Sequence, residues 1–270
     1  MKTTKAVILA AGLGTRMRRA DTGVRLTEAQ QATADDGLKA MIPIDRPFLD
    51  YVLSELADVG FRDVCLVVGP SHAPIRDYYT RLAPRRMRIA FAVQPRPLGT
   101  ADALAAAAEF AGHDSFIAIN SDNYYPGSAL AELHNGSTPA TIGFDRDALV
   151  ARGNISSDRV AGFAIMRRDA DGCLEQIQEK PDSAAIAQRA GPVLVSMNCW
   201  RFNALIFDAC RRIGPSSRGE YEIPDAVMCA IREFGICWRV IPCAAGVLDL
   251  SRQQDMESVA RALRGKEVNL

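Results

Sequence analysis

The stretch that decides the fold, residues 5–18, reads K-A-V-I-L-A-A-G-L-G-T-R-M-R. Its apolar run over 6–10 is typical of a buried parallel strand. Gly12 and Gly14 then allow the backbone to turn tightly beside a ligand. Free backbone N–H groups in such a turn attract anions, and the planar guanidinium of Arg16 suits phosphate oxygens. The segment therefore predicts a phosphate-binding loop after the first strand, with a purely structural turn as the alternative.

Two familiar glycine motifs do not fit this loop. A dinucleotide-binding fingerprint requires a third glycine where this chain has Met17, and an acid closing the second strand that is absent here. The phosphate-loop pattern that ends in Gly-Lys-Ser/Thr is absent as well. The loop therefore belongs to another class of nucleotide or phosphate site.

Strand-like and helical patterns alternate after the loop, which predicts an α/β fold with a doubly wound, mainly parallel, Rossmann-like sheet and ligands at the carboxyl ends of its strands. The second half alternates less regularly and predicts a smaller, mixed part of the same single domain. The expected strands are 6–10, 64–68, 89–93, 116–119, 160–166, 174–178 and 193–200, and the expected helices are 48–59, 74–81, 101–110 and 255–263.

Composition narrows the class of protein. A chain of 270 residues with 48% hydrophobic residues can bury a sizeable core as one domain. A formal net charge of zero gives no reason to expect a nucleic-acid or membrane partner. Without a long apolar stretch or a secretory pattern, we expect a cytoplasmic protein. Seven isolated cysteines without a C-x-x-C pair predict mostly buried thiols in a reducing compartment.

The string L-A-A-G-L-G-T-R-M at 9–17 resembles the signature loop of the sugar-1-phosphate nucleotidylyltransferases. These enzymes join a nucleoside triphosphate to a sugar phosphate and release pyrophosphate. Further matches extend the resemblance from residue 6 to about residue 250. For the loop it implies a set of nucleotide-binding residues, namely Leu9, Ala11, Gly12, Gly14, Thr15 and Arg16.

A lysine that serves the nucleotide phosphates follows the signature loop in this family. The best match here is Lys39 in L-K-A-M-I-P-I at 38–44, after a longer gap than is usual and with Leu38 in place of a proline. A surface lysine is the alternative. The intervening residues 26–34 have the propensities of a short helix, which we expect to act as a mobile flap over the phosphates.

The turn Q-P-R-P-L-G-T-A-D-A at 94–103 resembles the family's base-binding turn. The resemblance implies base contacts from Gln94 and Gly99, with Thr100 completing the nucleotide site. An amide that both donates and accepts can pair with the imide edge of uracil or thymine, and guanine also offers a mixed edge.

Two aspartates match the family's metal-binding positions. Asp122 ends F-I-A-I-N-S-D, with Ser121 where glycine is commoner, and Asp249 lies in V-L-D-L-S, with Val247 replacing a tryptophan. The resemblance implies that both carboxylates hold one Mg²⁺, a cation that prefers hard oxygen ligands.

The sugar side of the site is implied by Q-E-K-P at 178–181. By resemblance, Glu179 holds sugar hydroxyls and Lys180 the sugar phosphate. Asn198 is a further candidate for the hydroxyls, and Gly162 for a backbone amide contact with the sugar. The chain then divides into a nucleotide-binding half at about 1–135, a sugar-phosphate-binding half at about 136–250 and a C-terminal helix within 251–270.

Together these matches imply a Mg²⁺-dependent nucleotidylyltransferase whose partners are a nucleoside triphosphate, with UTP or dTTP favoured, and a sugar 1-phosphate, with glucose 1-phosphate favoured. Alternatives are the same chemistry with CTP, GTP or ATP and another phosphorylated acceptor, or a catalytically silent nucleotide-binding subunit. A homo-oligomer is compatible with the sequence. The catalytic candidates are Arg16, Lys39, Asp122, Lys180 and Asp249.

Overall fold

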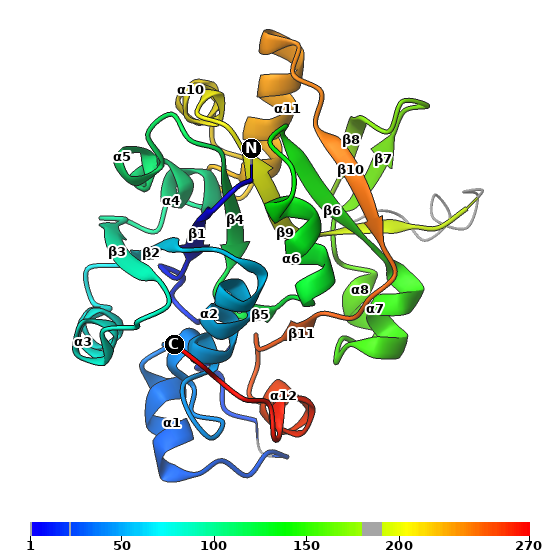
Figure 1. The fold of residues 1–270 in the computed structure, drawn as a ribbon. Helices are drawn as coiled ribbons and strands as arrows, with labels where there is room; N and C mark the ends of the chain where they lie inside the picture. The colour runs from blue at the N-terminus through cyan, green and yellow to red at the C-terminus, as the bar shows by residue number, and fades with distance from the viewer. Residues whose placement is uncertain (1, 22, 180–190) are drawn as a thin grey trace.

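The computed structural model describes residues 2–21, 23–179 and 191–270 (Figure 1). Within them the strands are β1 (Lys5–Leu9), β2 (Asp63–Val68), β3 (Arg88–Val93), β4 (Phe116–Asn120), β5 (Asn123–Tyr124), β6 (Ala140–Asp145), β7 (Ile165–Arg168), β8 (Leu174–Gln178), β9 (Leu194–Phe202), β10 (Arg239–Cys243) and β11 (Leu248–Asp249). The helices are α1 (Glu28–Asp35), the 3₁₀ turn η1 (Lys39–Met41), α2 (Phe48–Val59), α3 (Ala73–Leu82), α4 (Thr100–Ala106), α5 (Ala108–Ala111), α6 (Gly127–His134), α7 (Arg146–Arg152), α8 (Ser157–Val160), α10 (Leu205–Arg212), α11 (Ile223–Phe234) and α12 (Asp255–Leu263). None of these helices is long and apolar enough to cross a membrane.

One large sheet organises the described part of the chain. Its strand order is β10-β6-β9-β4-β1-β2-β3, with β7 and β8 added beside β9. Strands β1 to β4 pair in parallel with their neighbours among them, whereas β9 runs antiparallel between β4 and β6. The prediction of a mainly parallel α/β sheet with a mixed second part is therefore confirmed.

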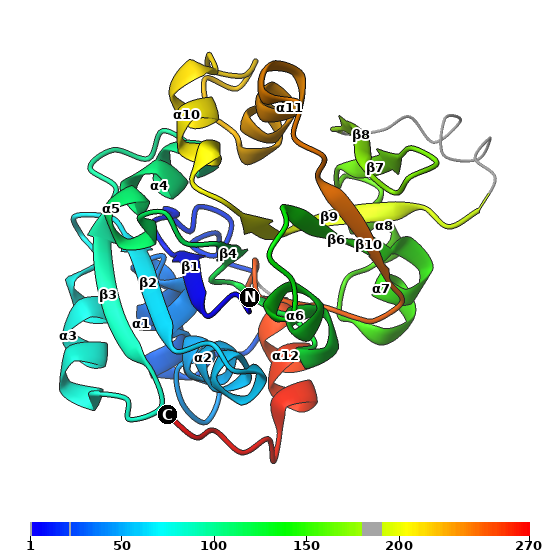
Figure 2. The same cartoon turned by 45° about the horizontal axis from the view of Figure 1, so that its top comes forward.

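Helices cover both faces of the sheet because its central strands are apolar on both sides. In β1, Val7 packs into one core with α4, α10 and α11, while Ala6 and Ile8 pack into the other with α2, α6 and α12. Figure 2 shows these two helical layers on either side of the strands. The apolar run read from the sequence thus supplies both cores at once.

The order of the strands places a binding site. From β1 the chain proceeds to β2 and β3 on one side, whereas β4 lies on the other side of β1. The carboxyl ends of β1 and β4 therefore flank a topological switch point, where ligands bind in open α/β sheets. The glycine loop follows β1 there, and Asp122 follows β4.

Two sequence predictions need correction. The strand predicted at 160–166 is wrong in its first part, because Val160 ends helix α8 and strand β7 begins only at Ile165. The buried end of a helix and the buried start of a strand make one apolar run, which periodicity could not divide. The helix predicted at 101–110 is interrupted at Ala107, which separates α4 from α5.

The cysteine prediction also needs correction, because Cys173 and Cys237 form a disulfide with a Cα–Cα distance of 5.4 Å. It ties the turn between β7 and β8 to the residues before β10, where Leu174 N also donates to Trp238 O at 2.6 Å. Cys65, Cys199 and Cys229 are buried thiols as predicted, and burial raises the pKa of Cys65 to about 12. The β7–β8 hairpin is therefore covalently fastened to the edge of the sheet.

Replacing Cys173 by Ser should lower the free energy of unfolding of the oxidised protein by about 2–4 kcal/mol, because the unfolded chain regains the entropy that the cross-link removes. Urea denaturation with and without dithiothreitol measures the change. In the reductant, wild type and variant should unfold at the same urea concentration. An equal difference under both conditions would contradict a stabilising disulfide.

Candidate functional site

A continuous cleft lies at the carboxyl ends of the central strands. It comprises a cavity of about 390 Å³ beside Gln94 and Gly99 and a larger one of about 850 Å³ beside Glu179 and Asp249. Residues of the glycine loop line both cavities. So do Lys39, Thr100, Asn120, Asp122, Asn198 and Glu220.

The glycine loop keeps its shape through a contact between two backbone segments. Gly14 has φ +64°, and a Cβ built there would lie 2.3 Å from Gly37 O. Gly37 has φ +73°, and its own Cβ would meet Leu13 O at 2.4 Å. Glycine is therefore required at both positions by conformation and by close approach. Arg16 is exposed at the rim of the larger cavity, as a phosphate ligand requires.

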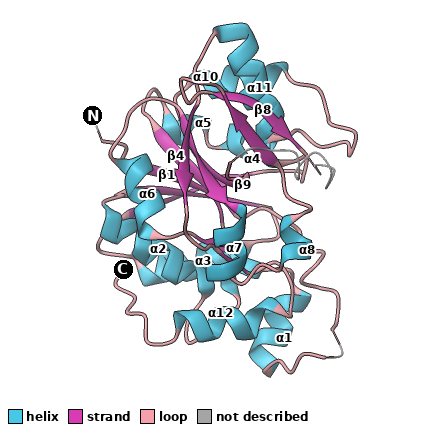
Figure 3. Ribbon diagram, turned by 90° about the vertical axis from the view of Figure 1, so that its right-hand side faces the viewer, coloured by secondary structure: helices cyan, strands magenta, loops and turns pink. Residues whose placement is uncertain are grey.

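The same contact explains the long gap before Lys39. Residues between Arg18 and Gly37 leave the loop and return to it, and Arg18 Nη2 donates to Asp36 O at 2.7 Å where they return. Helix α1 in this excursion lies at the same end of the molecule as α12 (Figure 3) and lines neither cavity. Ala34 is buried in the core. In this structure α1 is thus part of the packed body and does not cover the cleft as the predicted flap would.

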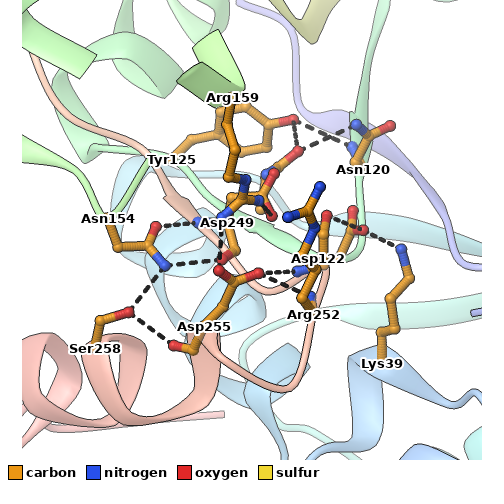
Figure 4. Close-up of polar contacts among 12 residues, drawn as sticks. Lys39, Asn120, Asp122, Tyr125, Asn154, Arg159, Asp249, Arg252, Asp255 and Ser258 are labelled. Carbon is orange, nitrogen blue, oxygen red and sulfur yellow. Dashed lines mark hydrogen bonds and ion pairs between the residues drawn. The ribbon is translucent and has the colours of Figure 1, made fainter. Parts of the chain in front are cut away.

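Lys39 reaches the site from the 3₁₀ turn that follows this excursion. Its Nζ forms an ion pair with Asp122 Oδ2 (Figure 4). Both side chains are mostly buried and line both cavities. The structure therefore brings together two predicted site residues that are far apart in the sequence.

A short antiparallel ladder places the two aspartates side by side. Strand β5 pairs with β11 so that Asn123 lies opposite Asp249. Leu250 N donates to Asp122 O at 2.8 Å, and Ser251 Oγ lies 3.5 Å from Asp122 Oδ2. Asp122 and Asp249 line the same cavity, as the sequence predicted.

Arg159, which the sequence did not single out, binds the second aspartate. Its Nη2 lies 2.9 Å from Asp249 Oδ1 and its Nη1 lies 2.6 Å from Asp255 Oδ1. Asp255 Oδ2 in turn accepts from the backbone N–H groups of Ser251 and Arg252 at 3.0 and 2.8 Å. Burial raises the pKa of Asp255, and Arg159 opposes that rise. Figure 4 shows Arg159 between the two carboxylates, so it neutralises charge in the most buried part of this cluster.

The turn predicted to bind the base is held against the loop before α11. Gly99 has φ +117°, and a Cβ there would lie 2.4 Å from Tyr221 O. Thr100 Oγ1 accepts from Ile223 N at 3.0 Å, which gives this predicted nucleotide residue a structural partner. Gln94 is only 4% exposed, and its Nε2 donates to Gly99 O at 3.0 Å. Gln94 and Gly99 thus form one wall of the smaller cavity.

Three of the predicted sugar-side residues line the larger cavity. They are Gly162, Glu179 and Asn198, whereas Lys180 lies outside the described residues. The Gly162 N–H donates to Arg159 O at 3.1 Å, so in this structure it already has an acceptor within the chain. Asn198 has φ +52°, a left-handed conformation that asparagine tolerates better than most residues. Its Oδ1 accepts from Trp200 Nε1 at 3.3 Å.

Two further polar residues of this cavity escaped the sequence analysis. Arg218 forms an ion pair with Glu222, and its Nη2 also lies 3.8 Å from Glu179 Oε2, so it contacts two acids of the cleft. Asn123 is buried, and its Nδ2 makes no hydrogen bond within the described part of the chain. A buried donor without an acceptor costs free energy. The position of Asn123 directly after Asp122 was the available signal.

The donor set fits a magnesium ion. Mg²⁺ is commonly held by one or two carboxylates together with substrate phosphates and water. Asp122 and Asp249 supply two such carboxylates, and the described residues contain no cluster of three or more His, Cys, Asp or Glu side chains that could form a complete protein cage. Here Lys39 and Arg159 balance the charge of the two aspartates.

A cleft at the switch point of a doubly wound sheet is typical of nucleotide-binding α/β proteins. Residues 5–235 match the nucleotidyl transferase family, and the chain belongs to it.

Relatives carry names from the same family. A glucose-1-phosphate thymidylyltransferase of Streptomyces antibioticus is 30% identical over 226 residues, which cover 83% of this chain and 56% of that protein. A UTP–glucose-1-phosphate uridylyltransferase, AglF, of Haloferax volcanii is 28% identical over 262 residues, which cover 96% of both. The chain thus spans little more than half the length of the Streptomyces relative.

Solved structures share the fold. A UDP-glucose pyrophosphorylase complexed with UDP-glucose has a TM-score of 0.72 at 17% identity, covering 98% of this chain and 100% of that one. HddC of Yersinia pseudotuberculosis, complexed with GMP-PN, has a TM-score of 0.65 at 20% identity, with the same coverage. At such identities the likeness concerns the fold alone.

Replacing Arg159 by Met should lower the free energy of unfolding by about 3 kcal/mol, because it leaves two largely buried carboxylates without their cation. Chemical denaturation at neutral pH measures the loss. The matched control is Arg261→Met, which removes an exposed ion pair with Glu257 on α12 and should cost less than about 1 kcal/mol. Equal losses in the two variants would show that the Arg159 cluster has no special role in stability.

Proposed function

We propose that this protein transfers a nucleotidyl group from a nucleoside triphosphate to a sugar 1-phosphate and releases pyrophosphate, with Mg²⁺ as cofactor. UTP or dTTP is the favoured donor and glucose 1-phosphate the favoured acceptor. The observation that carries the proposal is the pair of carboxylates, Asp122 and Asp249, that the β5–β11 ladder places in one cleft. Asp122 lines both cavities of this cleft, and Asp249 lines the larger one.

The relatives support the choice of substrates. One is named for thymidylyl transfer to glucose 1-phosphate, and another for uridylyl transfer to the same acceptor. Both bases carry the imide edge that suits a glutamine such as Gln94. We therefore favour a pyrimidine with a ring N–H as the base.

In the proposed reaction an oxygen of the sugar phosphate attacks the α-phosphorus of the triphosphate in line, and pyrophosphate leaves. The attacking group is already an anion, so no protein nucleophile or base is needed. The protein's task is to hold two anions together, which its cations make favourable. Arg16 would serve the departing pyrophosphate and Lys39 the nucleotide phosphates. Lys180 is proposed for the sugar phosphate from its place in the sequence.

Asp122 and Asp249 would hold the magnesium ion, which when bound supplies positive charge to phosphate oxygens and helps to orient them. Lys39 and Arg159 now neutralise these carboxylates. Once the aspartates hold a dication, Lys39 is free to turn toward phosphate, whereas Arg159 stays paired with Asp255. Glu179 would then complete the sugar side as an acceptor for hydroxyl groups.

A pyrophosphate-release screen tests the proposal directly. UTP, dTTP, CTP, GTP and ATP are each combined with a set of sugar 1-phosphates, with Mg²⁺ and with EDTA in its place. We expect release with UTP or dTTP and glucose 1-phosphate, and none in EDTA. Absence of release with every pair, from a protein that is folded, would reject the proposed reaction.

Replacing Asp122 or Asp249 by Asn should reduce kcat by on the order of 100-fold, because each substitution removes one charge from the metal site and such a loss costs about 3 kcal/mol at the transition state. Steady-state rates of pyrophosphate release measure the effect. Asp114→Asn, which breaks an exposed ion pair with Lys5 away from the cleft, is the matched control and should keep the wild-type rate. Normal turnover in both cleft variants would refute the assignment of the metal ligands.

A further inference from the structure

The side chain of Gln94 is fixed by two acceptors at once. Its Nε2 lies 3.0 Å from Gly99 O and 2.7 Å from Asp102 Oδ2. An amide nitrogen carries two N–H donors, so both are used. The reverse orientation of the amide would bring its oxygen against a carbonyl and a carboxylate, neither of which can donate. The neighbours of Gln94 therefore determine which atom of the amide faces which way.

Only Oε1 of this amide is then left for a ligand. Within the described residues Oε1 accepts no hydrogen bond, yet it is not among the side-chain atoms that are both buried and unpartnered. Because Gln94 lines the smaller cavity, Oε1 is the atom of the amide that remains to meet a ligand there. The amide that could both donate and accept by its chemistry is thus restricted to accepting.

Of the two acceptors that hold the Gln94 amide, Gly99 O belongs to the backbone and Asp102 Oδ2 to a side chain, which a substitution can change. Asp102 lies in the first turn of α4, and Gln94 directly follows the end of β3. An acid in a first helical turn is favourable in itself through the helix dipole. The hydrogen bond that its carboxylate makes, however, goes to Gln94, and the N-cap of α4, Gly99, has no side-chain cap bond.

We propose that Asp102 is a positioning residue that sets the base selectivity of the site, by locking Gln94 so that it offers only an acceptor to the base. Uracil and thymine meet this acceptor with the N3–H of their imide. Cytosine has an unprotonated nitrogen at the same ring position, so two acceptors would face each other there. The inference rests on the proposed function for the assignment of the smaller cavity to the base.

The test is equilibrium binding of UTP and CTP, measured by titration calorimetry with Mg²⁺ and without a sugar phosphate, so that no reaction occurs. Asp102→Asn keeps the size of the side chain but can present either an N–H or an oxygen to Gln94, which removes one of the two restraints on the orientation of the amide. We expect the ratio of UTP to CTP affinity to fall by about tenfold, the effect of one lost hydrogen bond of this kind. Asp114→Asn is the control and should keep the wild-type ratio.

A second variant separates positioning from a general structural role. Asp102→Glu retains the carboxylate and should retain more of the selectivity than Asp102→Asn. A purely structural role would weaken both nucleotides alike, leave the ratio unchanged and lower the melting temperature. That result in Asp102→Asn would overturn the inference, as would a wild-type protein that binds CTP as tightly as UTP.

The two proposals can fail separately. If wild type prefers UTP, Asp102→Asn loses that preference and no sugar phosphate gives pyrophosphate, the inference stands and the proposed reaction is wrong. If pyrophosphate is released and Asp102→Asn keeps the wild-type affinity ratio, the proposed reaction stands and the role of Asp102 is wrong.

Discussion

Two carboxylates held close together in a partly buried cleft repel each other, and the rest of the site is arranged around this repulsion. The β5–β11 ladder fixes Asp122 and Asp249 side by side through backbone hydrogen bonds, whatever their charge. Lys39 then neutralises one and Arg159 the other. The charge of the cleft is therefore balanced before any ligand arrives, and a dication would exchange with cations that the chain itself provides.

These two cations come from different parts of the molecule. Lys39 lies on the side of the sheet that carries the glycine loop, whereas Arg159 belongs to α8, next to the strands β7 and β9. Each is bound to an aspartate of the shared cleft. A ligand that displaces Lys39 or Arg159 from its aspartate therefore changes the electrostatic potential in both cavities.

Much of this could be predicted from the sequence, where short-range patterns decide the structure. The run 6–10 and the glycines after it placed β1 and its loop, and the limits expected for α2 and α12 agree with the structure. Arg159 could not be predicted, because its partners lie 90 and 96 residues further along the chain and nothing local marks it. The disulfide could not be predicted for the same reason, because the positions of seven isolated cysteines in the sequence do not show which two lie together in the fold.

The restriction of Gln94 shows the limit of reasoning from residue type. By composition its amide can donate and accept, and only the positions of Gly99 O and Asp102 reveal that the donors are already used. The predicted roles of the site residues depend in the same way on neighbours supplied by the fold. Those among the described residues line one cleft, while their hydrogen-bonding capacity is set by tertiary structure.

The close approach of Gly14 to Gly37 has a consequence for how this chain can vary in length. The two glycines form a clasp, and the residues between them make a closed excursion whose exit and entry are fixed at one point. Lys39 is placed by the clasp and not by the number of residues that precede it. Because both ends of the excursion are fixed at this one contact, a change of its length outside α1 need not move Lys39 or the cleft.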